Sequence, residues 1–71
     1  MPTNPQINDR VLIFQDPVTE KNSEGYAKIL QSLENDMPVI TDRKEGWKLI
    51  YFQVQFDDGY KAIRRIKVNS K

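Results

Sequence analysis

The chain has 71 residues, of which 38% are hydrophobic and 30% are charged. A chain this short supports one domain with a modest core, because small domains bury only about 60% of the surface that the unfolded chain exposes. The absence of cysteine excludes disulfides and thiolate metal sites, and the absence of histidine removes the commonest general base and metal ligand.

The net charge of +1 conceals an uneven distribution. Residues 1–36 carry three Lys or Arg against six Asp or Glu, whereas residues 37–71 carry eight against four. The last twelve residues contain no acid and five cations, which are Lys61, Arg64, Arg65, Lys67 and Lys71. This composition predicts a binding module that is not an enzyme, with no cofactor, no metal site and no small-molecule substrate.

Two features of the sequence concern its location. No apolar run approaches the ~20 residues that cross a bilayer, so we expect no membrane partner. Met1–Asp9 lacks the charged-then-apolar layout of a secretory signal. We therefore expect a cytoplasmic protein.

The first part of the chain predicts an arm, a strand and a loop. Residues 1–8 contain two prolines among small polar residues, which favours an extended arm. Arg10–Gln15 is a short apolar run that predicts a strand, and Pro17 ends it by keeping Asp16 out of helical geometry. Val18–Gly25 is polar and predicts a loop.

The segment Tyr26–Leu33 admits two interpretations. As a strand it places Ala27, Ile29 and Leu33 on one face, and it suits the neighbouring elements. As a helix covering about residues 23–34 it would have Ser23 as its cap and would make the fold α+β. We favour the strand because tertiary context overrides weak propensity.

The clearest predicted strand is Trp47–Phe56. Ile50, Phe52, Val54 and Phe56 are apolar and alternate with polar glutamines, which is the period of a half-buried strand. The segment before it predicts a turn at 34–36, a short extended piece at 39–41 and a charged turn at 42–46.

The end of the chain predicts a hairpin and two short strands. Asp58-Gly59 follows the central strand, and Gly59 accepts the positive φ of a type I′ turn without steric cost. We expect a return strand at 60–63, a corner at Arg64-Arg65, a last strand at 66–68 and a tail at 69–71. Five short strands with a tight hairpin favour a closed barrel, since closure removes sheet edges.

This pattern resembles the Tudor-like branch of the SH3-like barrels over residues 9–68. The resemblance lies in the segments 9–14, 25–30, 54–60 and 64–66, whereas the stretch 33–46 is longer and more charged than the usual compact turn. It implies a single all-β domain with a five-stranded barrel. It also implies an aromatic cage for a cation, and the matching positions are Phe14, Phe56 and Tyr60, with Asp58 as charge partner.

Two surfaces are candidates for binding. The leading hypothesis is nucleic-acid binding without base-specific readout, because the basic segment can neutralise phosphates while aromatic rings stack on bases. Its expected residues are Lys61, Arg64, Arg65, Lys67, Tyr60 and Tyr51. The adjacent carboxylates Asp57 and Asp58 are explained by the turn.

The alternative is a protein-interaction module that binds a peptide or partner. It would use strand addition or the side of the central strand opposite Phe52, where an exposed apolar patch would mark a contact. Its expected residues are Trp47, Leu49, Tyr51 and Phe14. We also consider that the stretch 33–46 covers this patch.

Overall fold

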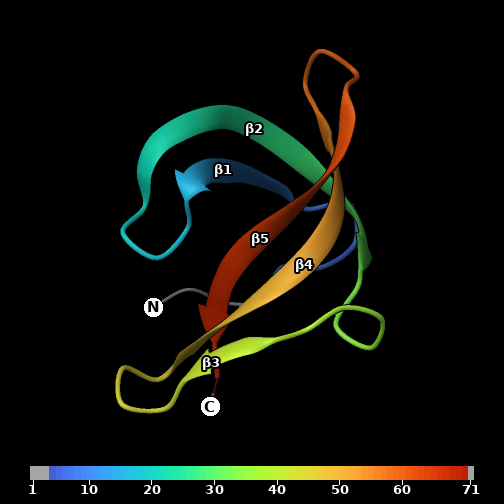
Figure 1. Cartoon of the computed structure of the whole chain (residues 1–71). Coiled ribbons are helices and arrows are strands. Elements are labelled where there is room, and N and C mark those ends of the chain that lie inside the picture. Colours follow the sequence, from blue (N-terminus) through green and yellow to red (C-terminus); the bar gives the residue numbers. More distant parts are fainter. Residues whose placement is uncertain (1–3, 71) are drawn as a thin grey trace.

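The computed structural model describes residues 4–70 and contains one open antiparallel sheet (Figure 1). Its five strands are β1 (Arg10–Asp16), β2 (Lys21–Ser32), β3 (Ile40–Asp42), β4 (Trp47–Phe56) and β5 (Lys61–Asn69). The strands β2 and β3 pair with different parts of one edge of β4, and β5 pairs with β4 along its other edge. Within residues 4–70 there is no helix, and so none that would span a bilayer.

The all-β expectation is confirmed, and the alternative of a helix at 23–34 is wrong. β2 runs through this segment, and its Ala27 and Ile29 are fully buried. Pairing with β1 on one side and β4 on the other satisfies the β2 backbone, which outweighs the helical propensity of its side chains.

The expected loop 18–25 is too long, because β2 already begins at Lys21. A tight turn suffices there. The Asp16 carboxylate accepts hydrogen bonds from the backbone N–H groups of Val18 and Thr19, and the Glu20 N–H donates to the Asp16 carbonyl. Glu20 has a positive φ of 58°, so the chain reverses within a few residues.

The C-terminal prediction of two short strands with a corner is also wrong. β5 is one continuous nine-residue strand, and it pairs with β4 without a register shift. Arg64 pairs with Phe52 and Arg65 with Tyr51, so both arginines lie within the ladder. Alternation along a strand therefore sends their side chains to opposite faces of the sheet.

The hairpin between β4 and β5 forms where the sequence predicts it but with a different turn. The Gly59 N–H donates to the Phe56 carbonyl, and the Phe56 N–H donates to the Tyr60 carbonyl. Gly59 has a φ of 95°, whereas neither aspartate before it has a positive φ. This is a type I turn followed by a glycine bulge, which is the common three-residue hairpin, and not a type I′ turn.

The core lies on the concave side of the sheet. Ile50, Phe52 and Val54 of β4 are buried as predicted, and Phe56 packs against them half-buried. The other buried core residues are Ile13, Ala27, Ile29 and Val68. Each fully buried Ile, Val or Phe side chain contributes about 1.5–3 kcal/mol when removed from water, so this cluster is the main stabilising element.

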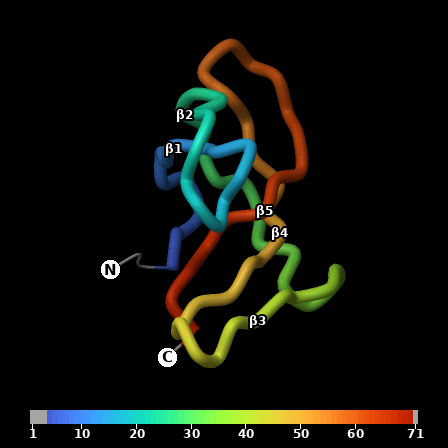
Figure 2. The backbone as a smooth tube through the Cα atoms, turned by 60° about the vertical axis from the view of Figure 1, so that its left-hand side comes forward, coloured from blue at the N-terminus to red at the C-terminus, as the bar shows by residue number. Residues whose placement is uncertain are grey.

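The sheet curls strongly, and β2 is bent along its length (Figures 1 and 2). Two β-bulges interrupt β2, one where Glu24 is the extra residue and one where Leu30 is. Bulges increase local twist and bend a strand. The curl brings the Cα atoms of β1 within 8 Å of those of β5, although these strands do not pair within the described residues.

Candidate functional site

The side of β4 and β5 opposite the core carries cations and no acids. We define the outer face as the exposed or half-buried side chains of this side between the Lys61 and Arg65 ends of the β4–β5 ladder, with the adjoining part of β2, which are Lys28, Gln31, Tyr51, Gln53, Gln55, Lys61, Ile63 and Arg65. The register places Lys28 and Lys61 on either side of Gln55. Adjacent strands lie about 5 Å apart, so these lysines stem from points about 10 Å apart.

Arg65 extends this set along β5. It is four residues from Lys61, a rise of about 13 Å along a strand, and it is the register partner of Tyr51. Lys28, Lys61 and Arg65 are exposed, and none of the three forms an ion pair within residues 4–70. The outer face therefore presents three available positive charges beside an aromatic ring.

Two of the predicted cations are already neutralised. Arg64 lies on the core side, and its Nε and Nη2 donate to Glu24 Oε2 and Oε1 at 2.9 and 3.3 Å. The Lys67 Nζ donates to the Val18 carbonyl at 3.0 Å and lies 3.7 Å from Glu20 Oε1. These contacts tie β5 to the start of β2, so the basic segment offers less free charge than its composition indicates.

The predicted partner residues do not form one surface. Leu49 is only 3% exposed and is therefore wrong as a contact residue. The chain after β2 runs beside this part of β4. The Leu33 N–H donates to the Tyr51 carbonyl, and the Glu34 carboxylate forms an ion pair with Lys48. Trp47 is half-buried at the start of β4, where Asp42 of β3 is its register partner.

Phe14 and Tyr51 do come together, in a groove at the free edge of β5. This edge groove has a volume of about 240 Å³. Its lining residues are Phe14, Gln15, Pro17, Glu24, Tyr51, Ile63, Arg64 and Arg65. Ile63 is 47% exposed there, so the groove is partly apolar.

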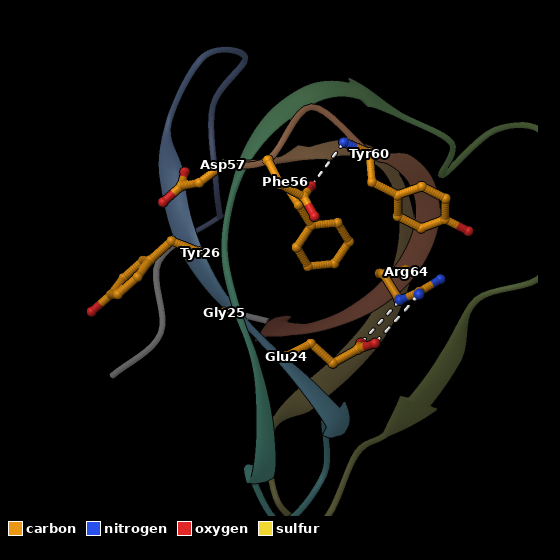
Figure 3. Close-up of a pocket in the computed structure, with 8 residues that line it drawn as sticks. Glu24, Gly25, Tyr26, Phe56, Asp57, Tyr60 and Arg64 are labelled. Atoms are coloured by element: carbon orange, nitrogen blue, oxygen red, sulfur yellow. Dashed lines mark hydrogen bonds and ion pairs between the residues drawn. The ribbon is translucent and has the colours of Figure 1, made fainter.

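A larger pocket of about 520 Å³ opens on the concave side at the end of the sheet (Figure 3). We call it the aromatic pocket. Its lining residues are Glu24, Gly25, Tyr26, Phe56, Asp57, Asp58, Tyr60 and Arg64. In Figure 3 the side chains of Phe56, Glu24 and Arg64 gather on the inside of the curl, whereas those of Tyr26 and Asp57 point away from it.

Aromatic and charged groups are layered in this pocket. The rings of Phe56 and Tyr60 stack with centroids 6.2 Å apart at 24°, and the Arg64 guanidinium lies 5.7 Å from the Phe56 centroid. The bulge in β2 directs Glu24 toward Arg64. Of the predicted cage residues, Phe56, Tyr60 and Asp58 line the pocket, but Phe14 lies in the edge groove.

The acidic hairpin is held by interactions of its own. Arg10 Nη2 donates to Asp57 Oδ2 at 2.6 Å, and the Arg10 guanidinium stacks over the Tyr26 ring at 4.2 Å. The hydrogen bond from Arg10 lowers the pKa of Asp57, and the same bond raises the pKa of Arg10. Asp58 Oδ1 accepts from the Tyr60 N–H at 2.9 Å.

Sequence reasoning missed Lys28, Glu24 and Tyr26. Lys28 joins the outer face only through the pairing of β2 with β4, and Glu24 reaches Arg64 only through a bulge. Neither the register nor the bulge has a signal in one sequence. In residues 4–70 no group of three or more acidic side chains is arranged to hold a metal ion.

Comparison with known proteins gives no further constraint. No protein-family model, no curated protein and no solved structure matches the chain.

Proposed function

We propose that this chain is a non-catalytic module that binds nucleic acid through the outer face. The observation that carries the proposal is the placement of Lys28, Lys61 and Arg65 on one face without an acid among them. Phosphates are attracted to such a face by charge alone, and binding releases their counterions.

The side chains next to these cations favour binding of single-stranded nucleic acid. Tyr51 lies beside Arg65, and an aromatic ring stacks on any base because every base has a π-face. Gln53 and Gln55 carry neutral amides that donate and accept hydrogen bonds. The acids beside this face are paired with other cations. Asp57, which lines a hollow with Lys28, pairs with Arg10. Glu24, which lines the edge groove with Arg65, pairs with Arg64.

Charge reversal tests this proposal. We expect Lys61→Glu with Arg65→Glu to weaken binding to a labelled single-stranded oligonucleotide at least tenfold at low salt, because two phosphate contacts become repulsive. Fluorescence anisotropy measures the affinity. The matched control is Arg43→Glu with Lys44→Glu, which makes the same charge change in the exposed turn between β3 and β4. Equal losses in both variants would contradict a role for the outer face.

A second candidate function is binding of an extended peptide at the free edge of β5. Among the described residues β5 pairs only with β4, and Ile63 and the half-buried Phe14 line the edge groove beside it. An added strand uses backbone hydrogen bonds and apolar contacts, which salt weakens little. A partner protein that stays bound at high salt while oligonucleotides do not bind would favour this function instead.

We also propose that the fold is an SH3-like barrel of the Tudor-like type. The segments that carry the resemblance lie in and next to β1, β2, β4 and β5, and the sheet curls until β1 comes near β5. The ion pairs of Glu24 with Arg64 and Glu20 with Lys67 support closure by side chains. Interstrand proton contacts between β1 and β5 in solution test it, and their absence would contradict a barrel.

A further inference from the structure

We infer that the aromatic pocket takes one guanine base of a single strand whose phosphates lie on the outer face. This inference rests on the proposed function and adds to it a base preference at one nucleotide. It is carried by the pocket's stacked rings, by its paired donor and acceptor groups, and by a groove that leads into it.

The rings supply a place for a flat base. Tyr60 is 61% exposed and stacks on the half-buried Phe56. The pocket volume of about 520 Å³ accommodates a purine together with part of its sugar. A base that stacks here gains aromatic contact on one face, which is the sequence-tolerant part of single-strand binding.

The groups beside the rings match the edges of guanine. Arg64 offers several N–H donors, and guanine O6 and N7 are the acceptors that arginine binds in a bidentate manner. Glu24 offers two acceptor oxygens, which suit the N1–H and N2–H donors of guanine. Adenine lacks the O6 acceptor, and uracil lacks an exocyclic amine, so neither satisfies both side chains.

In the free protein, Arg64 and Glu24 are paired with each other, and guanine would replace this pairing with its own hydrogen bonds to both side chains. Arg64 and Glu24 satisfy each other at 2.9 Å when no base is present, so neither charge is left without a partner. Their side chains are 32% and 22% exposed, and hydrogen bonds in such partly desolvated surroundings discriminate more than those in open water. A phosphate is disfavoured there because the Glu24 and Asp58 carboxylates would repel it.

A path connects the pocket to the outer face. The edge groove is lined by Glu24 and Arg64, which also line the aromatic pocket. It is lined as well by Tyr51 and Arg65 of the outer face. One strand can therefore lie with phosphates near Arg65, pass around the free edge of β5 and place a base against Tyr60.

The experiment compares single-stranded octamers of uridine with octamers that carry one central guanosine, adenosine or cytidine. We expect the guanosine octamer to bind about tenfold more tightly than the others, since a good bidentate contact discriminates to this degree. Glu24→Gln should reduce this ratio to less than twofold. The matched control is Glu34→Gln, which removes an exposed carboxylate that also pairs with a cation, Lys48, outside the aromatic pocket, and it should keep the ratio.

A second readout does not depend on the variants folding. In the unaltered chain, the backbone amide resonances of Gly25 and Tyr60 should shift with the guanosine octamer and not with the uridine octamer. Equal affinities for all octamers, or shifts confined to the outer face, would overturn the pocket while leaving the proposed function in place. Absence of binding by every octamer at low salt would overturn both.

Discussion

Arg64 and Arg65 are neighbours in the chain, yet β5 places them in opposite surroundings. Arg64 lies on the concave side, bonded to Glu24 and stacked near Phe56, whereas Arg65 lies on the outer face beside Tyr51. Lys61 and Lys67 lie on the same side of β5 as Arg65, yet Lys67 is paired with Glu20, whereas Lys61 forms no ion pair within residues 4–70. The register of β5 therefore sets which side of the sheet each cation faces, and the acids that the curl brings near β5 set which cations are paired.

The largest expected effect on stability comes from replacing Phe52 and Tyr51, the β4 register partners of Arg64 and Arg65. Phe52→Ala should destabilise the fold by about 3–5 kcal/mol, because it leaves a cavity in the core. Tyr51→Ala, on the other face of β4, should cost about 1 kcal/mol. Urea denaturation followed by circular dichroism measures both. Similar losses would contradict the assignment of the two faces.

A smaller effect is expected from the arginines themselves. Arg64→Ala should cost about 1–2 kcal/mol, because it leaves the partly buried Glu24 carboxylate without its charged donor. Arg65→Ala should change the free energy of unfolding by less than about 0.5 kcal/mol, as for most surface substitutions. The same urea titrations compare the two variants. Equal costs would mean that Arg64 is not held as described.

The smallest effect concerns the hairpin and depends on pH. The pKa of Asp57 is lowered in the folded state by the hydrogen bond from Arg10, so the pair stabilises the fold above the ordinary Asp value of about 3.9. This contribution is lost as the pH falls through the lowered pKa. The melting temperature of the unaltered chain should therefore fall more steeply below about pH 4 than that of Asp57→Asn. Parallel curves would contradict the pair.

Much of the fold follows from local patterns. The β4 boundaries are those predicted, because four alternating apolar residues and an Asp-Gly turn define them. The β2 start and the continuous β5 were not predicted, and the sequence left open whether Leu49 is exposed or covered. These depend on which strands pair and on what covers β4, and a one-residue shift in register would exchange the faces of a strand.

The candidate site was predicted less well than the fold. Lys61, Arg65 and Tyr51 share the outer face as expected, but Arg64 and Lys67 do not contribute free charge. Their partners, Glu24 and Glu20, are forty or more residues away in the chain, and only the curl of the sheet brings them near β5. A run of cations in a sequence therefore overstates the charge that a folded strand offers.

The most direct test of the central claim is the salt dependence of oligonucleotide binding. Three phosphate contacts to a single strand predict that the logarithm of the association constant falls with the logarithm of salt concentration with a slope of about −2. Anisotropy titrations between 25 and 200 mM salt would measure this slope. We predict a slope near −2 for the unaltered chain and a shallower slope, near −1, for the double variant Lys61→Ala with Arg65→Ala. A slope near zero for the unaltered chain would contradict binding through the outer face.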